Sequence, residues 1–332
     1  MVPKGRMRPL DMARDLQGLG ALIEVSFSGE LARRGADVWE ELHTLRRLIP
    51  VTRTLGKVSE EFRHLLDGVV WEDNGRIVGS VVVQRSGTDK DRWYIGAVAV
   101  HPDYRGRGIA RRLLAQAIEH AHRHGARVCV LDVRVDNAPA YNLYRSMGFV
   151  PYDELSQFKL QGIRGVQQLN FPPPFRLRPL KAREWRVYWR LALAETPPEV
   201  QEFLPVREAD YRLTPLQQLA LPLLTWLQGV AAYRYVVEVE GEQVAAFRLT
   251  AQCRDKGVHE LRWWFDPDHR GALAEPLLVQ ALRILAKYPK RNLVVTVRTQ
   301  FQDLIGLLQR YGFVEIERMH RMALRLEKSP TD

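Results

Sequence analysis

The sequence has few cysteines, no long apolar run and no block of like charge. Cys129 and Cys253 are the only cysteines among 332 residues. Both lie in apolar, strand-like runs, so we expect buried free thiols in a reducing cytoplasm rather than a disulfide framework. No window reaches the roughly 18 consecutive apolar residues that span a bilayer. The basic N-terminus is not followed by an apolar stretch, so we predict no signal peptide and no membrane partner.

The formal net charge of +10 admits two interpretations. It favours a negatively charged partner, such as nucleic acid or a phosphorylated cofactor. It is equally typical of a surface that arginine simply covers. No run of five Lys or Arg residues occurs, and aromatic residues do not alternate with basic ones along a predicted strand. A nucleic-acid-binding protein is therefore the weaker hypothesis.

The two halves of the chain resemble each other. Four short segments recur in the same order with a slowly falling offset, which chance is unlikely to produce. The matched pairs are residues 6–10 with 176–180, 72–76 with 238–242, 101–106 with 266–271, and 144–149 with 308–313. We predict two copies of one fold: a first domain at 1–165, a proline-rich linker at 166–174, and a second domain at 175–332.

Hydrophobic periodicity in the first copy predicts alternating strands and helices. The strands are expected at residues 6–10, 69–72, 77–84, 93–100 and 128–135, with a hairpin turn at Asp73, Asn74 and Gly75. The helices are expected after Asp11 as N-cap, then at 38–48, 109–124 and 139–147. This order predicts an α/β (α+β) fold, a mixed sheet with helices on its faces.

A glycine-rich turn connects the strand at 93–100 to the next helix. Gly106 and Gly108 carry no side chain that would block an anion from reaching the free N–H groups of the helix N-terminus. Nearby arginines add positive charge, so the turn has the chemistry of a pyrophosphate cradle. It lacks the Lys-Ser/Thr ending of a nucleotide P-loop and the third glycine of a dinucleotide-binding motif. A plain tight turn is the alternative.

Two motifs extend this observation. The pattern Arg105-x-x-Gly108-x-Ala110 follows Val98-Ala99-Val100-His101-Pro102, and about thirty residues later comes a segment from Asn137 to Gly148-Phe149. Together they resemble the GNAT superfamily of acyl-CoA-dependent N-acyltransferases over residues 6–160. The resemblance implies two tandem domains, each with a mostly antiparallel sheet and a V-shaped splay between central strands. The layout alone is similar to that of mycothiol synthases.

The resemblance also implies a site for acetyl-CoA and no metal. The backbone of Val98, Ala99 and Val100 would pair with the pantetheine arm, and Asn137 would hydrogen-bond it from the other side. The pyrophosphate would be held by the segment Arg105, Gly106, Arg107, Gly108, Ile109, Ala110 and Arg111. Tyr144 would contact the cofactor and donate a proton to the departing thiolate as general acid. A half-buried helix tyrosine is the alternative interpretation.

Other parts of the site stay open at this level. The general base could be one of several side chains or a water chain. The side chains of suitable type are Glu72, Asp91, Tyr94, His101 and Asp132. His120, His122 and His124 cluster at a helix end. Only His120 and His124 share a helix face, and no third metal ligand for that pair can be recognised, so we predict no metal site there. Trp263 and Trp264 could form a substrate wall, although packing within a strand is the commoner role.

The second copy is expected to be degenerate. Its turn at residues 266–274 is one residue shorter and lacks the second glycine, and Phe301 and Leu308 replace Asn137 and Tyr144. We therefore predict an N-acetyltransferase with one working copy that acts on a small-molecule or peptide amine. A homodimer is one arrangement that the second copy would allow. The alternative is a non-catalytic acyl-CoA-binding regulatory module.

Overall fold

A computed structural model describes residues 5–34, 67–86, 89–162, 169–212, 225, 229–254 and 257–327 of the chain. The chain divides into two compact units. The first contains Met1–Pro151 together with Arg321–Asp332, and the second contains Tyr152–His320. In the part of the chain that is described, no helix is long and apolar enough to cross a membrane.

The first unit follows the predicted order of elements. Asp11 caps the first helix, because its Oδ1 accepts a hydrogen bond from the Ala13 N–H at 3.0 Å. The helix expected at 38–48 lies outside the described residues. The elements are β1 (Arg6–Pro9), α1 (Met12–Arg34), β2 (Asp67–Asp73), β3 (Arg76–Ser86), β4 (Asp89–Val100), α4 (Ile109–Arg123), β5 (Val128–Arg134) and α5 (Ala138–Ser146).

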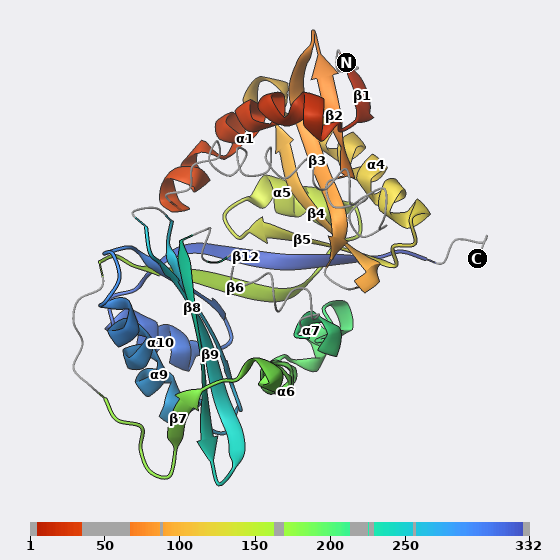
Figure 1. Cartoon of the computed structure of the whole chain (residues 1–332). Coiled ribbons are helices and arrows are strands. Elements are labelled where there is room, and N and C mark those ends of the chain that lie inside the picture. The colour runs from red at the N-terminus through yellow and green to blue at the C-terminus, as the bar shows by residue number, and fades with distance from the viewer. Residues whose placement is uncertain are drawn as a thin grey trace. The chain divides into compact units, whose positions relative to one another are not determined.

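The sheet of the first unit runs in the order β1-β2-β3-β4-β5, with the end of β12 (Val314–Arg325) beside β5. Its pairings are antiparallel up to β4, and β4 pairs with β5 in parallel. Alternate residues of β2 face opposite helices. Val69 and Trp71 pack with α4, whereas Val70 packs with Leu22 of α1. The two helices therefore cover the two faces of the sheet (Figure 1).

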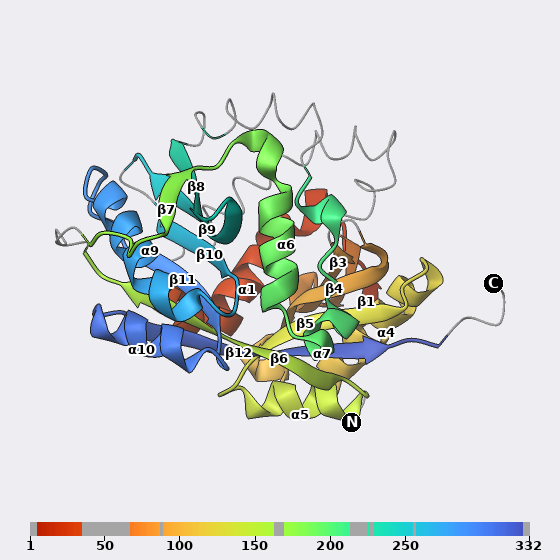
Figure 2. The same ribbon diagram turned by 90° about the horizontal axis from the view of Figure 1, so that it is seen from below.

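The second unit repeats this plan. Its sheet order is β12-β6-β11-β10-β9-β8-β7. Helix α6 covers one face, and α9 and α10 cover the other (Figure 2). The elements are β6 (Val150–Leu160), β7 (Arg176–Pro179), α6 (Arg186–Glu195), α7 (Pro198–Phe203), β8 (Val230–Val239), β9 (Glu242–Gln252), β10 (His259–Phe265), α9 (Arg270–Leu285), β11 (Leu293–Arg298) and α10 (Gln302–Arg310). The predicted fold class is confirmed.

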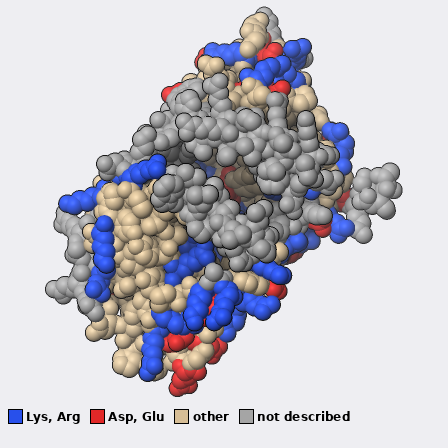
Figure 3. Space-filling model, viewed as in Figure 1, with Lys and Arg blue, Asp and Glu red and all other residues tan. Residues whose placement is uncertain are grey.

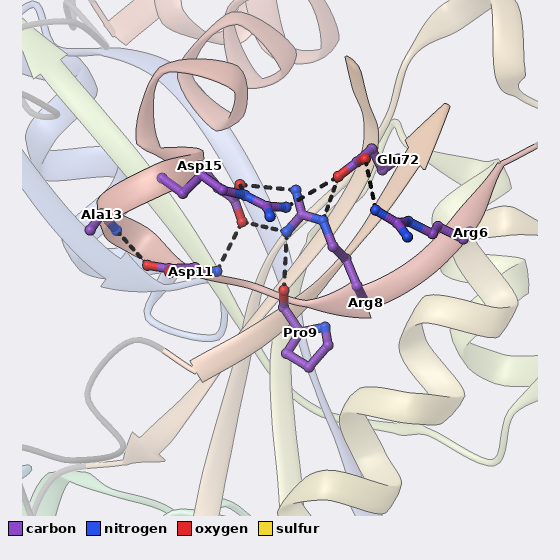
Figure 4. A network of polar contacts seen from close by, with 8 residues as sticks. Arg6, Arg8, Pro9, Asp11, Ala13, Asp15 and Glu72 are labelled. Atoms are coloured by element: carbon purple, nitrogen blue, oxygen red, sulfur yellow. Dashed lines mark hydrogen bonds and ion pairs between the residues drawn. The ribbon is translucent and has the colours of Figure 1, made fainter. Parts of the chain in front are cut away.

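An ion-pair network recurs in both units. In the first, the Arg8 guanidinium donates to Asp15 at 2.6 and 2.9 Å, and its Nε donates to Glu72 at 2.5 Å (Figure 4). In the second, Arg178 donates in the same way to Glu184 at 3.0 Å and from Nε to Glu238 at 2.8 Å. The repeat seen in the sequence therefore has a counterpart in side-chain geometry.

These two networks differ in burial, which predicts a difference in stability. The side chains of Arg8 and Asp15 are 15% and 2% exposed, compared with 30% and 26% for Arg178 and Glu184. Removing the buried arginine takes away the two-bond partner of a buried carboxylate and leaves it with the Asp11 N–H and the more exposed Arg14. We expect Arg8→Met to lower the free energy of unfolding by about 3 kcal/mol. The matched change Arg178→Met should cost about 1 kcal/mol, because water screens that pair. Chemical denaturation at pH 7 measures both.

The pH dependence provides a second test of the Arg8 network. Burial alone would raise the pKa of Asp15, but hydrogen bonds from Arg8, the Asp11 N–H and Arg14 outweigh it and lower the pKa to about 2. Because the folded pKa is depressed below 3.8, this contribution to stability is present above pH 4 and is lost as the pH falls through 2. The deficit of Arg8→Met should shrink over that range. Equal deficits in the two arginine variants would contradict the assignment.

The compact units do not follow the boundaries predicted at residues 165 and 175. β6 belongs to the first half of the sequence but pairs antiparallel with β11 along residues 155–160 and 293–298, which places it in the second unit. Conversely, the last residues of β12 lie in the first unit. The thiols also divide. Cys129 is buried as expected, but the expectation for Cys253 is wrong, because it lies past the end of β9 and is exposed.

Candidate functional site

The central strands of the first unit separate after a short paired segment. β4 and β5 pair only from Arg92 to Tyr94 and from Val128 to Val130, although both strands continue further. Ala97 has a positive φ of 47° within β4, and its carbonyl accepts a hydrogen bond from Ser80 Oγ at 3.0 Å. This bulge turns β4 away from β5, which matches the predicted V-shaped splay.

The strand segment Val98, Ala99 and Val100 forms one wall of this opening. Its other edge pairs with β3, where Ala99 lies opposite Ser80 and Val100 opposite Gly79. Past Tyr94, the strand register pairs no β4 residue with β5 among the described residues. The backbone groups on this edge are therefore placed to pair with an extended ligand, as β-strand addition requires.

The loop after β4 has the geometry of an anion cradle. Gly106 and Gly108 both have φ of +75°, a conformation that residues with a Cβ rarely adopt. A Cβ built on either glycine would meet nothing within 4 Å, so both face open space. Gly108 is the N-cap of α4, whose 15 residues align their dipoles toward this point. The residues present therefore fit a bound pyrophosphate.

The predicted cradle residues have different roles within the loop. Arg105 Nε donates to the Val100 carbonyl at 3.2 Å, and Arg107 donates to the Asp103 carbonyl at 2.6 Å. Arg111 donates to Ser146 Oγ, which ties α4 to α5. Ile109 is buried in the core, so only its backbone is available to a ligand. Ala110 is half-buried at the first turn of α4.

The second motif lies at the start and middle of α5. Asn137 is the N-cap, and its Oδ1 accepts a hydrogen bond from the Ala140 N–H at 3.2 Å. This bond fixes the side chain and leaves the amide NH₂ as the group that can donate to a ligand. Tyr144 is 5% exposed, and burial raises the pKa of its hydroxyl to about 12. It is therefore protonated at neutral pH.

Two of the candidate bases are committed to structural contacts. Glu72 accepts hydrogen bonds from Arg6, Arg8 and Arg14, and the hydrogen bond from Arg8 chiefly lowers its pKa. His101 Nε2 lies 3.0 Å from the Arg76 guanidinium, and its Nδ1 lies 3.3 Å from the Asp103 N–H. Both neighbours are donors, and a neutral imidazole has one lone pair, so the lone pair that a base needs is engaged by one of them in either tautomer.

The other candidates lie along β4 and β5. Asp91 is at the paired end of β4, 3.7 Å from Arg127, and so lies away from the splay. Tyr94 and Asp132 lie where the strands separate, and the Tyr94 hydroxyl donates to Asp132 at 3.4 Å. Asp132 is also 3.4 Å from Arg321. Burial and the Asp132 charge raise the pKa of Tyr94, so Asp132 is the better placed acceptor of a proton.

The histidine cluster at the end of α4 has structural partners. His120 Nε2 lies 2.9 Å from Asp67, His122 Nε2 lies 2.8 Å from the Glu327 carbonyl, and His124 Nδ1 lies 2.8 Å from the His120 carbonyl. Among the described residues, no group of three metal-ligating side chains is present. The first contact connects the helix end to β2, the second connects it to the segment after β12, and the third lies within the helix end itself.

The corresponding region of the second unit has different side-chain contacts. β10 and β11 also pair over three residues only, from His259 to Leu261, so a splay is present. Arg270, however, lies 4.2 Å from the centre of the Phe301 ring and donates to Asp303 at 2.8 Å. Arg270, which lies in the turn at residues 266–274 and begins α9, is therefore held by side chains of its own unit. Burial raises the pKa of nearby Glu195 to about 7, against the charges of Arg298 and Arg270.

Several residues that shape the first site were not found from the sequence. Ser80 holds the bulge in β4, and Ser146 holds Arg111. The Tyr104 hydroxyl donates to Asp73 at 2.8 Å, which fixes the loop on the β2–β3 turn. Each contact joins segments far apart in sequence. Of these residues, Tyr104 had a signal in the sequence, because a tyrosine in a loop beside a cradle needs a hydrogen-bond partner for its hydroxyl.

Comparison with known proteins identifies the family. Residues 37–149 match the model of the acetyltransferase (GNAT) family. N-alpha-acetyltransferase 30 of Schizosaccharomyces pombe is 33% identical over 103 residues, which cover 30% of this chain and 68% of that protein. N-alpha-acetyltransferase RimI of Mycobacterium tuberculosis is 43% identical over 76 residues, 23% of this chain and 46% of that protein. The chain belongs to the GNAT family and is an acetyl-CoA-dependent N-acetyltransferase.

Solved structures extend the likeness over the whole chain. A GCN5-related N-acetyltransferase from Sphaerobacter thermophilus has a TM-score of 0.68 at 14% identity, and the match covers 98% of this chain and 97% of that one. A tandem GNAT protein from the clavulanic acid biosynthesis pathway has a TM-score of 0.59 at 17% identity, covering 98% and 99%. At such low identity these matches show the fold.

Proposed function

We propose that the first unit transfers an acetyl group from acetyl-CoA to a primary amine, by direct attack of the amine on the thioester. The observation that carries this proposal is the joined geometry of the splay, the glycine cradle at Gly106 and Gly108, and the buried Tyr144. The α-amino group of a peptide or protein is the first acceptor to test, because the relatives are named N-alpha-acetyltransferases.

Acetyl-CoA, when bound, supplies the activated acetyl group as a thioester. The N–H groups at the start of α4 would bind its pyrophosphate, and the free edge of Val98 to Val100 would pair with its amide groups. Asn137 would donate to the same arm from α5. These contacts fix the carbonyl carbon in one place, and positioning of this kind lowers the barrier before any proton moves.

Proton transfers at either end of the reaction involve two side chains. The amine forms the new N–C bond as the C–S bond breaks. Tyr144 holds a proton at its hydroxyl and would donate it to the departing sulfur. Asp132 would accept the proton that the amine loses, directly or through water. The assignment of Asp132 rests on its place at the splay and its contact with Tyr94.

A basic nucleic-acid-binding protein was the alternative suggested by the net charge. On the face shown in Figure 3, Lys and Arg side chains of the described residues form several separate groups rather than one stripe. A backbone-tracking groove needs a continuous basic surface. The described residues on this face therefore give no support to the nucleic-acid-binding alternative.

A calorimetric titration followed by peptide acetylation tests the proposal. We expect one acetyl-CoA bound per chain, because only the first unit carries the glycine cradle. We then expect acetylation of a peptide with a free α-amine and blocked lysine, read by mass spectrometry of the N-terminal residue. A matched peptide with a blocked α-amine and a free lysine is the control. Binding without transfer to any amine would favour the non-catalytic, acyl-CoA-binding alternative.

A further inference from the structure

Three arginines lie side by side across the sheet of the second unit. In the strand register Arg234 of β8 is opposite Arg248 of β9, and Arg248 is opposite Arg262 of β10. Directly opposite residues on neighbouring antiparallel strands have Cβ atoms roughly 5 Å apart. All three side chains line one cavity of about 310 Å³ on the face covered by α6.

This row is specific to the second unit. In the match of residues 72–76 with 238–242, the three arginines correspond to Gly68, Val82 and Gly96 of the first unit. These residues also lie opposite one another, Gly68 with Val82 and Val82 with Gly96. The first unit therefore has two glycines and a valine where the second unit has three guanidinium groups. The shared fold does not require charge there, so the row needs an explanation of its own.

Without a ligand, the row is electrostatically unfavourable. Like charges directly opposite each other destabilise a sheet. Arg262 donates to Glu260 at 2.7 Å, but among the described residues no acidic side chain pairs with Arg234 or Arg248. Loss of water around Arg248, followed by the charges of Arg234 and Arg262, lowers its pKa. An anion placed between the three groups would remove this repulsion.

Aromatic side chains form the walls of the cavity. Trp185, Tyr188, Tyr211 and Trp264 line it, and the rings of Tyr188 and Trp264 are 4.7 Å apart. Within the described part of the chain, neither indole N–H of Trp185 and Trp264 has a hydrogen-bond acceptor. Flat apolar walls with free donors suit a planar ring that carries acceptors.

The remaining charged residues of the lining keep the cavity positive. Lys181 adds a fourth cation, and Asp210 is the one acid in the described lining. With several cations and one acidic side chain in its lining, the cavity favours a ligand group with two negative charges over a ligand with a single carboxylate. The volume is at the lower end of the range for small-molecule sites, which is large enough for one ring and one phosphate.

We propose that this cavity is a second binding site, which takes a small phosphate monoester joined to a planar ring. The phosphate lies on Arg234, Arg248 and Arg262, and the ring lies between Trp185 and Trp264. The site is separate from the acetyl-CoA cradle in sequence and in the unit that carries it. Trp264 then has the wall role that the sequence left open, while Trp263 is buried on the opposite face with α9.

Phenyl phosphate is the probe that tests this site, by calorimetry and by quenching of tryptophan fluorescence on the full chain. We expect one molecule bound per chain and at least tenfold weaker binding in Arg248→Gln. Benzoate and inorganic phosphate should each bind at least tenfold more weakly than phenyl phosphate. Arg283→Gln, on an exposed part of α9, is the matched control and should bind as the wild type does.

Thermal unfolding supplies a readout that does not depend on binding heats. Phenyl phosphate should raise the melting temperature of the wild type but not that of Arg248→Gln, which should be at least as stable without ligand. Binding must also persist in Gly108→Glu, so failure of this site and failure of the acetyl-CoA site are distinguishable. Binding that is unchanged in Arg248→Gln and Arg234→Gln, or absent in the wild type, would overturn the proposal.

Discussion

Replacing Gly108 by glutamate is expected to abolish acetyl-CoA binding and with it all acetyl transfer. The new side chain would extend into the open space in front of the α4 N-terminus and place a negative charge at the proposed pyrophosphate site. Both bulk and repulsion act in the same direction, so we expect the dissociation constant to rise at least about 100-fold. Calorimetric titration with acetyl-CoA measures the loss directly.

The control for this variant lies at the other end of the same helix. Gly125 also has a positive φ, of 85°, and also faces open space. Gly125→Glu therefore introduces the same backbone strain and the same charge, but away from the cradle. We expect its affinity for acetyl-CoA to stay within about threefold of the wild type. Similar losses in both variants would mean that strain or global charge, rather than the cradle, explains the effect.

The sequence predicted the backbone geometry of this loop because that geometry is local. Gly106, Gly108 and the start of α4 are consecutive, so turn and helix N-terminus follow from the order of residues alone. The same holds for the capping of α5 by Asn137 and for the hairpin after Asp73. In the structure all of these elements begin and end within a few residues of the predicted bounds.

Features that depend on pairing between distant strands could not be predicted in this way. The exchange of β6 and the end of β12 between units leaves no trace in periodicity, because either sheet would bury the same residues. The bulge at Ala97 depends on Ser80 of the neighbouring strand. The arginine row of the second unit also becomes visible only when the hairpin register is known.

The comparison of the two units explains why one of them is expected to work alone. Both keep the splay, the hairpins and the arginine network that fix the sheet. They differ at the turn before the long helix, where one has free glycines and the other has Arg270 bound to Asp303 and Phe301. The two units therefore share the sheet and the ion-pair network that fixes it, but they differ in the charged residues placed on that sheet.

Tyr144→Phe is expected to lower kcat about 100-fold, the usual effect of removing a positioned general acid. The KM for acetyl-CoA should stay within about twofold, because the ring remains in the core. Its hydroxyl is protonated at neutral pH, since burial raises the pKa to about 12. Steady-state kinetics with a peptide acceptor at pH 7.5 measures both parameters.

Stability separates this catalytic effect from a structural one. Among the described residues the Tyr144 hydroxyl has no hydrogen-bond partner, so its removal should leave the melting temperature nearly unchanged. Tyr141→Phe, one turn earlier on α5, is the matched control and should keep full kcat. The expected pattern is a loss of turnover confined to Tyr144, with binding and folding intact. If kcat in Tyr144→Phe equals that of the wild type, the proton reaches the thiolate from another group, and Tyr144 serves only to pack α5 against the sheet.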